Sequence, residues 1–276
     1  MNPKLIDTHS HLNFNVFKKE AVGLMEKCLK EKIWLINVGT ELSTSKIAIE
    51  YANKFEKGIY AAVGLHPLYV NTGVVELKID KNEFDSKETD LIFNYNKFKK
   101  IASQEKVVAI CETGLDYWYK PKATAKKEIF KQKQKEVFVQ QLDLAKELDL
   151  PIIIHCRLAF GDIFDILKSY GNIPGVFHCF TGNPEEAEKV LDYGFYLGFN
   201  GIIFKKDLKG VIEKTPLDKI LLETDCPYLC PLKSKRNTPL NLRYICEKIA
   251  KIKKVSFDEV AEKTTNNAIK LFNLPT

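Results

Sequence analysis

Short apolar runs alternate along this sequence with longer segments in which apolar residues recur at the period of a helix. Eight runs, bounded mostly by polar, Gly or Pro residues, predict β-strands over residues 5–7, 33–38, 59–64, 107–111, 152–154, 175–177, 195–197 and 219–222. Helical periodicity predicts helices over residues 17–31, 44–55, 90–104, 124–148, 161–170 and 184–192. Strands separated by helices indicate crossover connections and therefore a parallel sheet.

Eight strand–helix units predict an α/β protein with the architecture of a (β/α)8 TIM barrel. The chain has 276 residues, and such a barrel takes about 250, so residues 1–276 are predicted to form a single domain. A doubly wound sheet is the alternative, but it would bind its ligand beside a phosphate-binding glycine turn. Neither GxGxxG nor GxxxxGKS occurs in the sequence. We therefore expect no nucleotide cofactor.

Two segments depart from the repeating unit. Residues 68–90 form a long, polar connection after the third strand, which is either a tolerated surface insertion or a flap over a catalytic face. Residues 256–272 predict a C-terminal helix with a capping box at Ser256 and Glu259. We expect this helix to close the bottom of the barrel.

Composition adds only a little to the prediction of substrate and cellular compartment. The net charge of +6 favours a polyanionic substrate, although lysine-rich helices can carry such charge as ordinary solvated faces. The seven cysteines are expected to be free core residues, because large intracellular proteins rarely depend on disulfides. No apolar stretch is long enough to span a membrane and the N-terminus does not resemble a signal peptide. These features predict an intracellular protein, cytoplasmic or nuclear.

The candidate chemistry lies at the ends of the predicted strands. All five histidines of the chain follow or close an apolar run, and two carboxylates end runs of the same kind. These residues are His9, His11, His66, Glu112, His155, His178 and Asp225. The carboxyl ends of barrel strands converge on one face, and imidazoles with carboxylates are typical ligands of divalent metals in hydrolytic sites. The sequence therefore predicts a metal centre.

Six motifs in fixed order resemble one known family. DTHSHL, GLHP, ETGLDY, HCR, HCFTG and ETDCPYL are similar to the motifs of the TatD-related deoxyribonucleases, a branch of the metal-dependent amidohydrolase-like barrels. The resemblance extends from about residue 5 to about residue 270. It implies a (β/α)8 barrel, two divalent metal ions and hydrolysis of DNA phosphodiester bonds, typically from the 3′ end.

The resemblance also implies roles for individual residues. His9, His11 and Asp225 would bind one metal, His155 and His178 would bind the second, and Glu112 would bridge them. Asp225 would act as general base for a water between the ions. The ligand types suit zinc, manganese and, less readily, magnesium.

Three further residues are predicted to contact substrate or ligands. His66 either donates a hydrogen bond to the substrate phosphate or orders its own loop, and Asp116 orients a ligand or a substrate group. Arg157 either clamps phosphate or pairs with a neighbouring acid.

The departures from the family pattern affect substrate recognition more than metal binding. They are Asn13, Cys111 and Leu158 in the motifs, the insertion after GLHP, and the segment in which Lys233, Lys235 and Arg236 supply charge without the usual histidine. Two alternatives to a deoxyribonuclease therefore stay open. One is a small-molecule hydrolase that cleaves esters, lactones, amides or phosphoesters, and the other is a non-catalytic binding protein.

Overall fold

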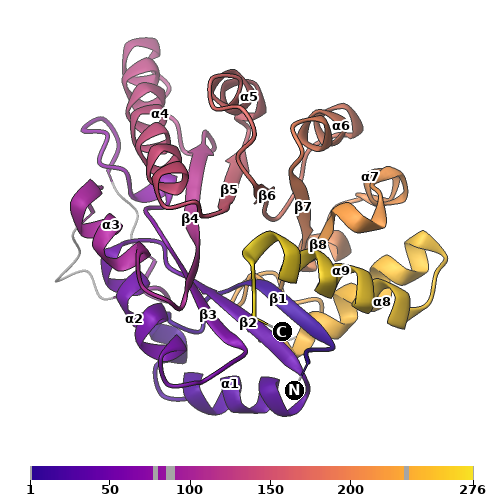
Figure 1. Cartoon of the computed structure of the whole chain (residues 1–276). Helices are drawn as coiled ribbons and strands as arrows, with labels where there is room; N and C mark the ends of the chain where they lie inside the picture. Colours follow the sequence, from indigo (N-terminus) through magenta and orange to yellow (C-terminus); the bar gives the residue numbers. More distant parts are fainter. Residues whose placement is uncertain (1, 77–79, 85–90, 233–235, 276) are drawn as a thin grey trace.

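The fold is a nearly closed barrel of eight parallel strands with helices around it (Figure 1). The computed structural model describes residues 2–76, 80–84, 91–232 and 236–275. Each strand pairs with the next in sequence order. The strands are β1 (Leu5–Ser10), β2 (Ile33–Val38), β3 (Ile59–Val63), β4 (Val107–Asp116), β5 (Ile152–Arg157), β6 (Gly175–Phe177), β7 (Tyr196–Phe199) and β8 (Ile220–Leu222). The predicted (β/α)8 TIM barrel is confirmed.

Helices lie around the barrel; most of them connect consecutive strands, and the last two follow β8. They are α1 (Ala21–Lys30), α2 (Leu42–Ala52), α3 (Tyr95–Ala102), α4 (Thr124–Glu147), α5 (Phe160–Leu167), α6 (Pro184–Asp192), α7 (Lys209–Lys214), α8 (Leu242–Lys253) and α9 (Phe257–Phe272). Short 3-10 helices add η1 (Asn15–Phe17), η2 (Pro67–Tyr69), η3 (Gly201–Phe204), η4 (Leu217–Lys219) and η5 (Pro239–Asn241).

Side chains along each strand alternate between two apolar layers, one inside the barrel and one between the barrel and the helices. In β2, Ile33 and Leu35 belong to the outer layer that packs against the helices, whereas Trp34, Ile36 and Val38 fill the barrel interior. Successive side chains of a strand point to opposite faces, and both faces of this sheet are covered. Nearly continuous apolar runs are therefore what the strands require, which explains why periodicity located them.

Helix α9 closes the amino-terminal end of the barrel, as expected from the sequence. Ser256 accepts a hydrogen bond from the Glu259 N–H at 3.1 Å and begins the helix. Leu271 and Phe272 join the apolar cluster inside the barrel. Asn267 donates to the Ile220 carbonyl at 2.8 Å, which ties the helix to the start of β8.

The seam between β8 and β1 is joined by hydrogen bonds outside a regular ladder. The Asp225 N–H donates to the His9 carbonyl at 2.8 Å, and the Thr8 hydroxyl donates to the Leu222 carbonyl at 3.1 Å. The buried Asp7 carboxylate accepts from both the N–H and the hydroxyl of Thr224. Burial raises the pKa of Asp7 to about 7, against these hydrogen bonds. The seam thus carries the first and last predicted ligands.

Several boundaries differ from the prediction. Strand β4 continues five residues beyond its predicted end, to Asp116, because Gly114 lets the chain pass close to β5; a Cβ there would lie 2.0 Å from the His155 carbonyl oxygen. Helix α3 begins at Tyr95, later than predicted. Parts of the predicted insertion (residues 77–79 and 85–90), and Lys233 and Lys235, lie outside the described residues.

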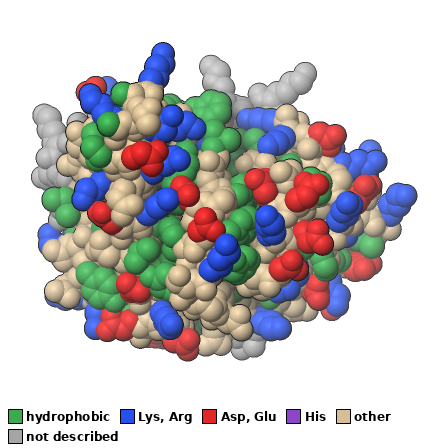
Figure 2. All heavy atoms as spheres, turned by 90° about the horizontal axis from the view of Figure 1, so that it is seen from above, with side chains coloured by type: hydrophobic (Ala, Val, Ile, Leu, Met, Phe, Trp, Pro, Cys, Tyr) green, Lys and Arg blue, Asp and Glu red, His purple; other side chains and the backbone are tan. Residues whose placement is uncertain are grey.

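The surface and the cysteines agree with the compositional argument. All seven cysteines are free. No helix within the described residues is both long and apolar enough to cross a membrane. Figure 2 shows one face of the molecule, on which basic and acidic side chains are interspersed. On that face the net positive charge is spread out, so it gives no continuous basic surface.

Candidate metal centre

The six predicted ligands meet at the carboxyl ends of the strands. Five of them line a cavity of about 340 Å³ together with His66, Asp116 and Arg157. The sixth, His9, is fully buried and contacts Glu112, which lines the cavity. The ligands come from β1 (His9) and the residue after it (His11), β4 (Glu112), β5 (His155), and the segments after β6 (His178) and β8 (Asp225). Residues as far apart in the sequence as His11 and Asp225 thus line one cavity.

The Glu112 carboxylate lies at the middle of this group, with one oxygen directed to each side. Its Oε2 is 3.2 Å from His9 Nε2 and 3.9 Å from His11 Nε2. Its Oε1 is 2.9 Å from His155 Nδ1 and 2.8 Å from His178 Nε2. On the first side, His11 Nε2 also lies 3.4 Å from Asp225 Oδ1. The side chains therefore form two adjoining clusters that share one carboxylate.

Three sets of donor atoms are close enough to hold a metal ion, each set within 4.8 Å. One is His9, His11 and Asp225, which is the set predicted for the first metal. The other two each contain Glu112, with His9 and His178 in one and with His66 and His155 in the other. The donor types fit zinc or manganese, since imidazole nitrogen and carboxylate oxygen suit these ions.

His66 is a hydrogen-bond donor in this arrangement and a poor metal ligand. Its Nδ1 accepts the Leu68 N–H at 3.0 Å, so the neutral ring carries its proton on Nε2. That Nε2 faces Glu112 Oε1 and His155 Nδ1, each 3.3 Å away. A protonated nitrogen has no lone pair for a metal, so Nε2 is placed as a hydrogen-bond donor, and the Nδ1 contact with Leu68 orders the loop, one of the two roles predicted for His66.

The rings of two candidate ligands are oriented by hydrogen bonds on their far side. His11 Nδ1 donates to the Val38 carbonyl at 2.9 Å, and His155 Nε2 donates to Asp116 Oδ2 at 3.1 Å. Each bond fixes the tautomer and leaves the other nitrogen free to bind a metal. Asp116 is thus placed to orient a ligand, one of the two roles predicted for it. His178 Nδ1, in contrast, lies 3.8 Å from Glu223 Oε2, beyond hydrogen-bonding distance.

The electrostatics keep the carboxylates ionised and one imidazole neutral. Burial acts to raise the pKa of Glu112, but the imidazoles around it hold that pKa well below its usual value. The pKa of Asp225 is lowered in the same way, chiefly by its hydrogen bond with His11. Burial lowers the pKa of His9 to about 4. Although burial opposes it, hydrogen bonds to Asp116 and Glu112 raise the pKa of His155 to about 10.

Backbone conformation is unusual beside the candidate ligands. Asp225 has φ 54° and Cys179, which follows His178, has φ 45°. Both values lie in the left-handed region that residues other than glycine rarely adopt. Such conformations cluster at functional sites, where the surrounding structure imposes them. The surrounding contacts in this site are two hydrogen bonds. Glu223 Oε2 accepts the Cys179 N–H at 2.9 Å, and Asn200 donates to Asp225 Oδ2 at 3.5 Å.

Sequence reasoning missed two glutamines that support the site from α4. The buried Gln141 accepts the Leu65 N–H at 2.8 Å and donates to the Leu65 carbonyl at 3.0 Å and to the Thr113 hydroxyl. Gln134 accepts the Asp116 N–H at 2.9 Å and donates to the Pro67 carbonyl at 3.1 Å. A detectable signal existed, because two polar residues spaced by seven lie on one apolar face of a helix.

The insertion brings a carboxylate to the mouth of the cavity that sequence reasoning did not single out. Glu83 Oε2 accepts the Thr40 hydroxyl at 3.0 Å, and Glu83 Oε1 lies 3.3 Å from the Tyr228 hydroxyl, which donates to Asp80 Oδ2 at 2.8 Å. Burial raises the pKa of Glu83 to about 7, while His11 lowers it. The insertion is therefore part of the site.

Arg157 lies at the rim on the other side of the cavity. Its guanidinium stacks on Trp118, with Cζ 4.4 Å from the ring centroid, and the Trp118 ring is 55% exposed. The two expectations for Arg157, a phosphate clamp or a partner for a neighbouring acid, stay predictions.

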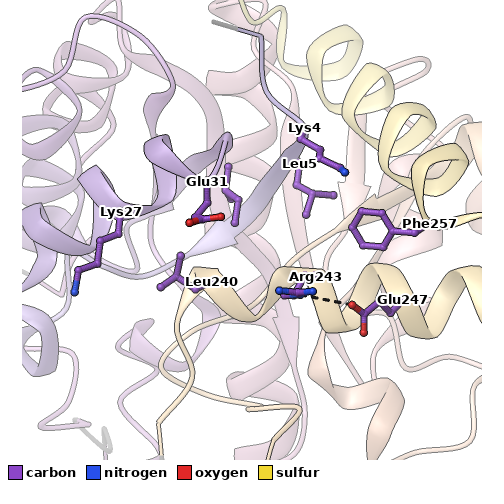
Figure 3. Close-up of a pocket in the computed structure, with 9 residues that line it drawn as sticks. Lys4, Leu5, Lys27, Glu31, Leu240, Arg243, Glu247 and Phe257 are labelled. Atoms are coloured by element: carbon purple, nitrogen blue, oxygen red, sulfur yellow. Dashed lines mark ion pairs between the residues drawn. The ribbon is translucent and has the colours of Figure 1, made fainter.

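Another cavity lies far from this chemistry. Figure 3 shows a cavity of about 720 Å³ lined by residues that include Lys4 and Leu5 near the start of β1, Lys27 of α1, and Arg243 of α8. These residues mark the amino-terminal end of the strands, and barrel enzymes carry their active sites at the opposite end. We therefore place the functional site at the smaller cavity.

Comparison with known proteins agrees with the motifs and the geometry. A sequence model of the family described as TatD related DNase matches residues 6–273. The "uncharacterized metal-dependent hydrolase YabD" of Bacillus subtilis is 40% identical, over 98% of this chain and 99% of that protein. A similarly named hydrolase of Methanocaldococcus jannaschii is 31% identical over 98% and 97%. The crystal structure of YJJV, a TatD homolog from Escherichia coli, superimposes with a TM-score of 0.81 at 27% identity, covering both chains completely. The chain belongs to the family of TatD-related DNases.

Proposed function

We propose that this protein is a divalent-metal-dependent deoxyribonuclease that removes nucleotides from the 3′ end of DNA. Water adds to the phosphorus atom, the bond from phosphorus to the 3′ oxygen of the preceding nucleotide breaks, and that oxygen leaves with a proton. The products are a nucleoside 5′-monophosphate and a strand one residue shorter. Family membership and the "metal-dependent hydrolase" names of the relatives support this reaction.

The observation that carries the proposal is the position of Glu112 between two clusters of imidazoles. One carboxylate oxygen is 3.2 Å from His9 Nε2, and the other is 2.8 Å from His178 Nε2. A carboxylate shared in this way suits a pair of cations, with His9, His11 and Asp225 at one and His155 and His178 at the other. Two such ions would polarise the phosphoryl oxygen, lower the pKa of water and stabilise the leaving oxygen.

The chain's own residues supply proton transfer and binding. Asp225 is ionised at neutral pH, and we assign it the role of general base that accepts the proton of the attacking water. His66 donates from Nε2 to the scissile phosphate, because its Nδ1 is occupied by the Leu68 N–H. Arg157 contacts the next phosphate of the strand from the rim.

The test is hydrolysis of single-stranded DNA labelled at the 3′ or the 5′ end. Metal-stripped protein is resupplied separately with Mg²⁺, Mn²⁺ or Zn²⁺, and released products are resolved by size. We expect at least one metal to restore mononucleotide release, with loss of the 3′ label first. EDTA should abolish it.

Glu112→Ala provides the blank, and Glu105→Ala, an exposed glutamate just before β4, is the matched control. Glu112→Ala should lose hydrolysis, and Glu105→Ala should retain it. Failure to cleave DNA with every metal, from folded protein that binds those metals, would refute the nuclease proposal.

A second candidate is a small-molecule hydrolase, which one observation favours. The cavity at the candidate ligands measures about 340 Å³, at the lower end of the range for small-molecule sites. A panel of esters, lactones, amides and phosphodiesters, assayed with the same metals, separates the two candidates. Cleavage of the panel with no cleavage of DNA would favour the small-molecule reaction.

A further inference from the structure

The insertion after η2 is fixed onto the barrel at the mouth of the site. The Asn15 N–H donates to the Glu83 carbonyl at 2.9 Å, and the Val16 N–H donates to the Asn82 carbonyl at 3.0 Å. Next to Glu83, Phe84 is buried and packs edge-to-face on Tyr69, with ring centroids 5.1 Å apart. These backbone and ring contacts give the Glu83 side chain a defined position.

The Glu83 carboxylate points into the cavity that holds the candidate ligands. It lines this cavity with His11, Glu112 and Asp225. The Thr40 hydroxyl donates to one of its oxygens at 3.0 Å, and the Tyr228 hydroxyl, which donates to Asp80 Oδ2 at 2.8 Å, lies 3.3 Å from the other. Each carboxylate oxygen can accept a further hydrogen bond, so Glu83 can still bind a donor from a ligand.

Glu83 also marks the junction with a second, larger cavity. A space of about 940 Å³ beside the insertion shares Leu68, Glu83, Arg157 and Tyr228 with the cavity of the candidate ligands. Tyr119 and Phe130 line this larger space and provide apolar surface suited to nucleoside groups. A ligand that extends from the metal centre into it passes the Glu83 carboxylate.

The mouth of the site has charges of opposite sign on opposite sides. Glu83 is held between Thr40, which follows β2, and Tyr228, which follows β8, on either side of β1 in the barrel. Arg157 ends β5 and stacks on Trp118, which follows β4. A phosphate is therefore attracted on the β4–β5 side and repelled on the Glu83 side.

We infer that Glu83 is the specificity-determining residue that accepts a hydrogen bond from the free 3′-hydroxyl of the terminal nucleotide and excludes a phosphate from the same position. The inference rests on the proposed nuclease function and defines which strand ends the enzyme takes. Inside a strand, the 3′ oxygen carries the next phosphate, which would meet the carboxylate. At a free end the 3′ oxygen belongs to a hydroxyl group, which can donate a hydrogen bond to the carboxylate.

The first experiment compares oligonucleotides that end in a 3′-hydroxyl or a 3′-phosphate, at pH 8.5, where the Glu83 carboxyl is ionised. We expect the wild type to favour the hydroxyl end by about tenfold or more in kcat/KM, because like charges in close contact cost more than 1.4 kcal/mol. Glu83→Gln should reduce the preference to about threefold or less. Glu105→Gln removes the same charge from an exposed position just before β4, outside both cavities, and should keep the preference. Equal discrimination by Glu83→Gln and the wild type would overturn the inference.

The second experiment separates this inference from the nuclease proposal. Calorimetry measures the binding of deoxyadenosine 5′-monophosphate and 3′,5′-bisphosphate to the metal-loaded protein. The monophosphate should bind more tightly to the wild type, and Glu83→Gln should bring the two affinities together. A protein that cleaves no DNA but shows this pattern would refute the nuclease proposal and uphold the role of Glu83. An unchanged affinity ratio in Glu83→Gln would refute that role, whatever the hydrolysis assay gives.

Discussion

Replacement of Gln141 by leucine should destabilise the fold by several kcal/mol, although Gln141 is not a candidate ligand. The side chain is buried in α4 and makes three hydrogen bonds, two of them with the backbone of Leu65. Leucine has nearly the same volume but offers no polar atom. The N–H and carbonyl of Leu65 would therefore be left buried without their partner.

The magnitude follows from these two groups. An unsatisfied buried donor or acceptor costs about 1–3 kcal/mol, so two of them cost about 2–6 kcal/mol. That is a large part of the 5–15 kcal/mol by which a typical domain is stable. Leu65 directly precedes His66, so hydrolysis should also weaken through loss of His66 positioning.

The assay is urea unfolding of the metal-stripped protein, with the free energy extrapolated to water. Gln140→Leu is the matched control, because Gln140 is the preceding residue of the same helix and is exposed. It should change the free energy of unfolding by no more than about 0.5 kcal/mol. If both variants destabilise equally, the hydrogen bonds of Gln141 do not support the site, and the reasoning is wrong.

Three further predictions concern the metal ligands and their surroundings. First, Asp116→Asn should weaken metal binding by about 10–100-fold, because the carboxylate that orients His155 is lost; an unchanged dissociation constant in calorimetry would contradict this. Second, the raised pKa of His155, about 10, means that the ring is protonated at pH 7 in the metal-free protein and must release that proton to bind a metal. Metal affinity should therefore fall as the pH falls and rise with pH towards 10. The binding enthalpy should depend on the ionisation enthalpy of the buffer, because the released proton is taken up by the buffer. A binding enthalpy that is the same in every buffer would refute this prediction. Third, Gly198→Ala should cost about 1–3 kcal/mol, since its Cβ would lie 1.9 Å from the Glu223 carboxylate. Gly161→Ala, with no atom within 4 Å of the added Cβ, should be neutral or slightly stabilising in the same unfolding assay.

The barrel could be predicted because its strands are buried on both faces. Such strands require continuous apolar runs, and β2 and β6 occur at the predicted residues. The extension of β4 to Asp116 could not be predicted, because it depends on the close approach of Gly114 to the His155 carbonyl. Helices α7 and α8 were not predicted. Helix α7 has only six residues, too few for a periodic signal, whereas α8 buries residues at helical spacing that the prediction overlooked.

The candidate ligands were accessible to sequence reasoning for a related reason. Strand order and chain direction determine which residues reach one face of a barrel, so side chains at the ends of apolar runs had to converge. The position of Glu83 follows from no such rule. It depends on how the insertion folds back on Asn15 and Val16, and loop conformation depends on contacts that periodicity does not encode.

The contacts that hold the candidate ligands together do not require a metal. A buried carboxylate is unfavourable unless it is paired, and Glu112 is surrounded by imidazole nitrogens from both sides of the site. The protein therefore compensates this charge with protonated His155, whose Nε2–H donates to Asp116 and whose Nδ1 carries a second proton directed to Glu112. Metal ions would replace that proton without moving the strands, because Gln134 and Gln141 hold the neighbouring backbone through the barrel itself. The protein's own contacts thus set the geometry of the candidate centre.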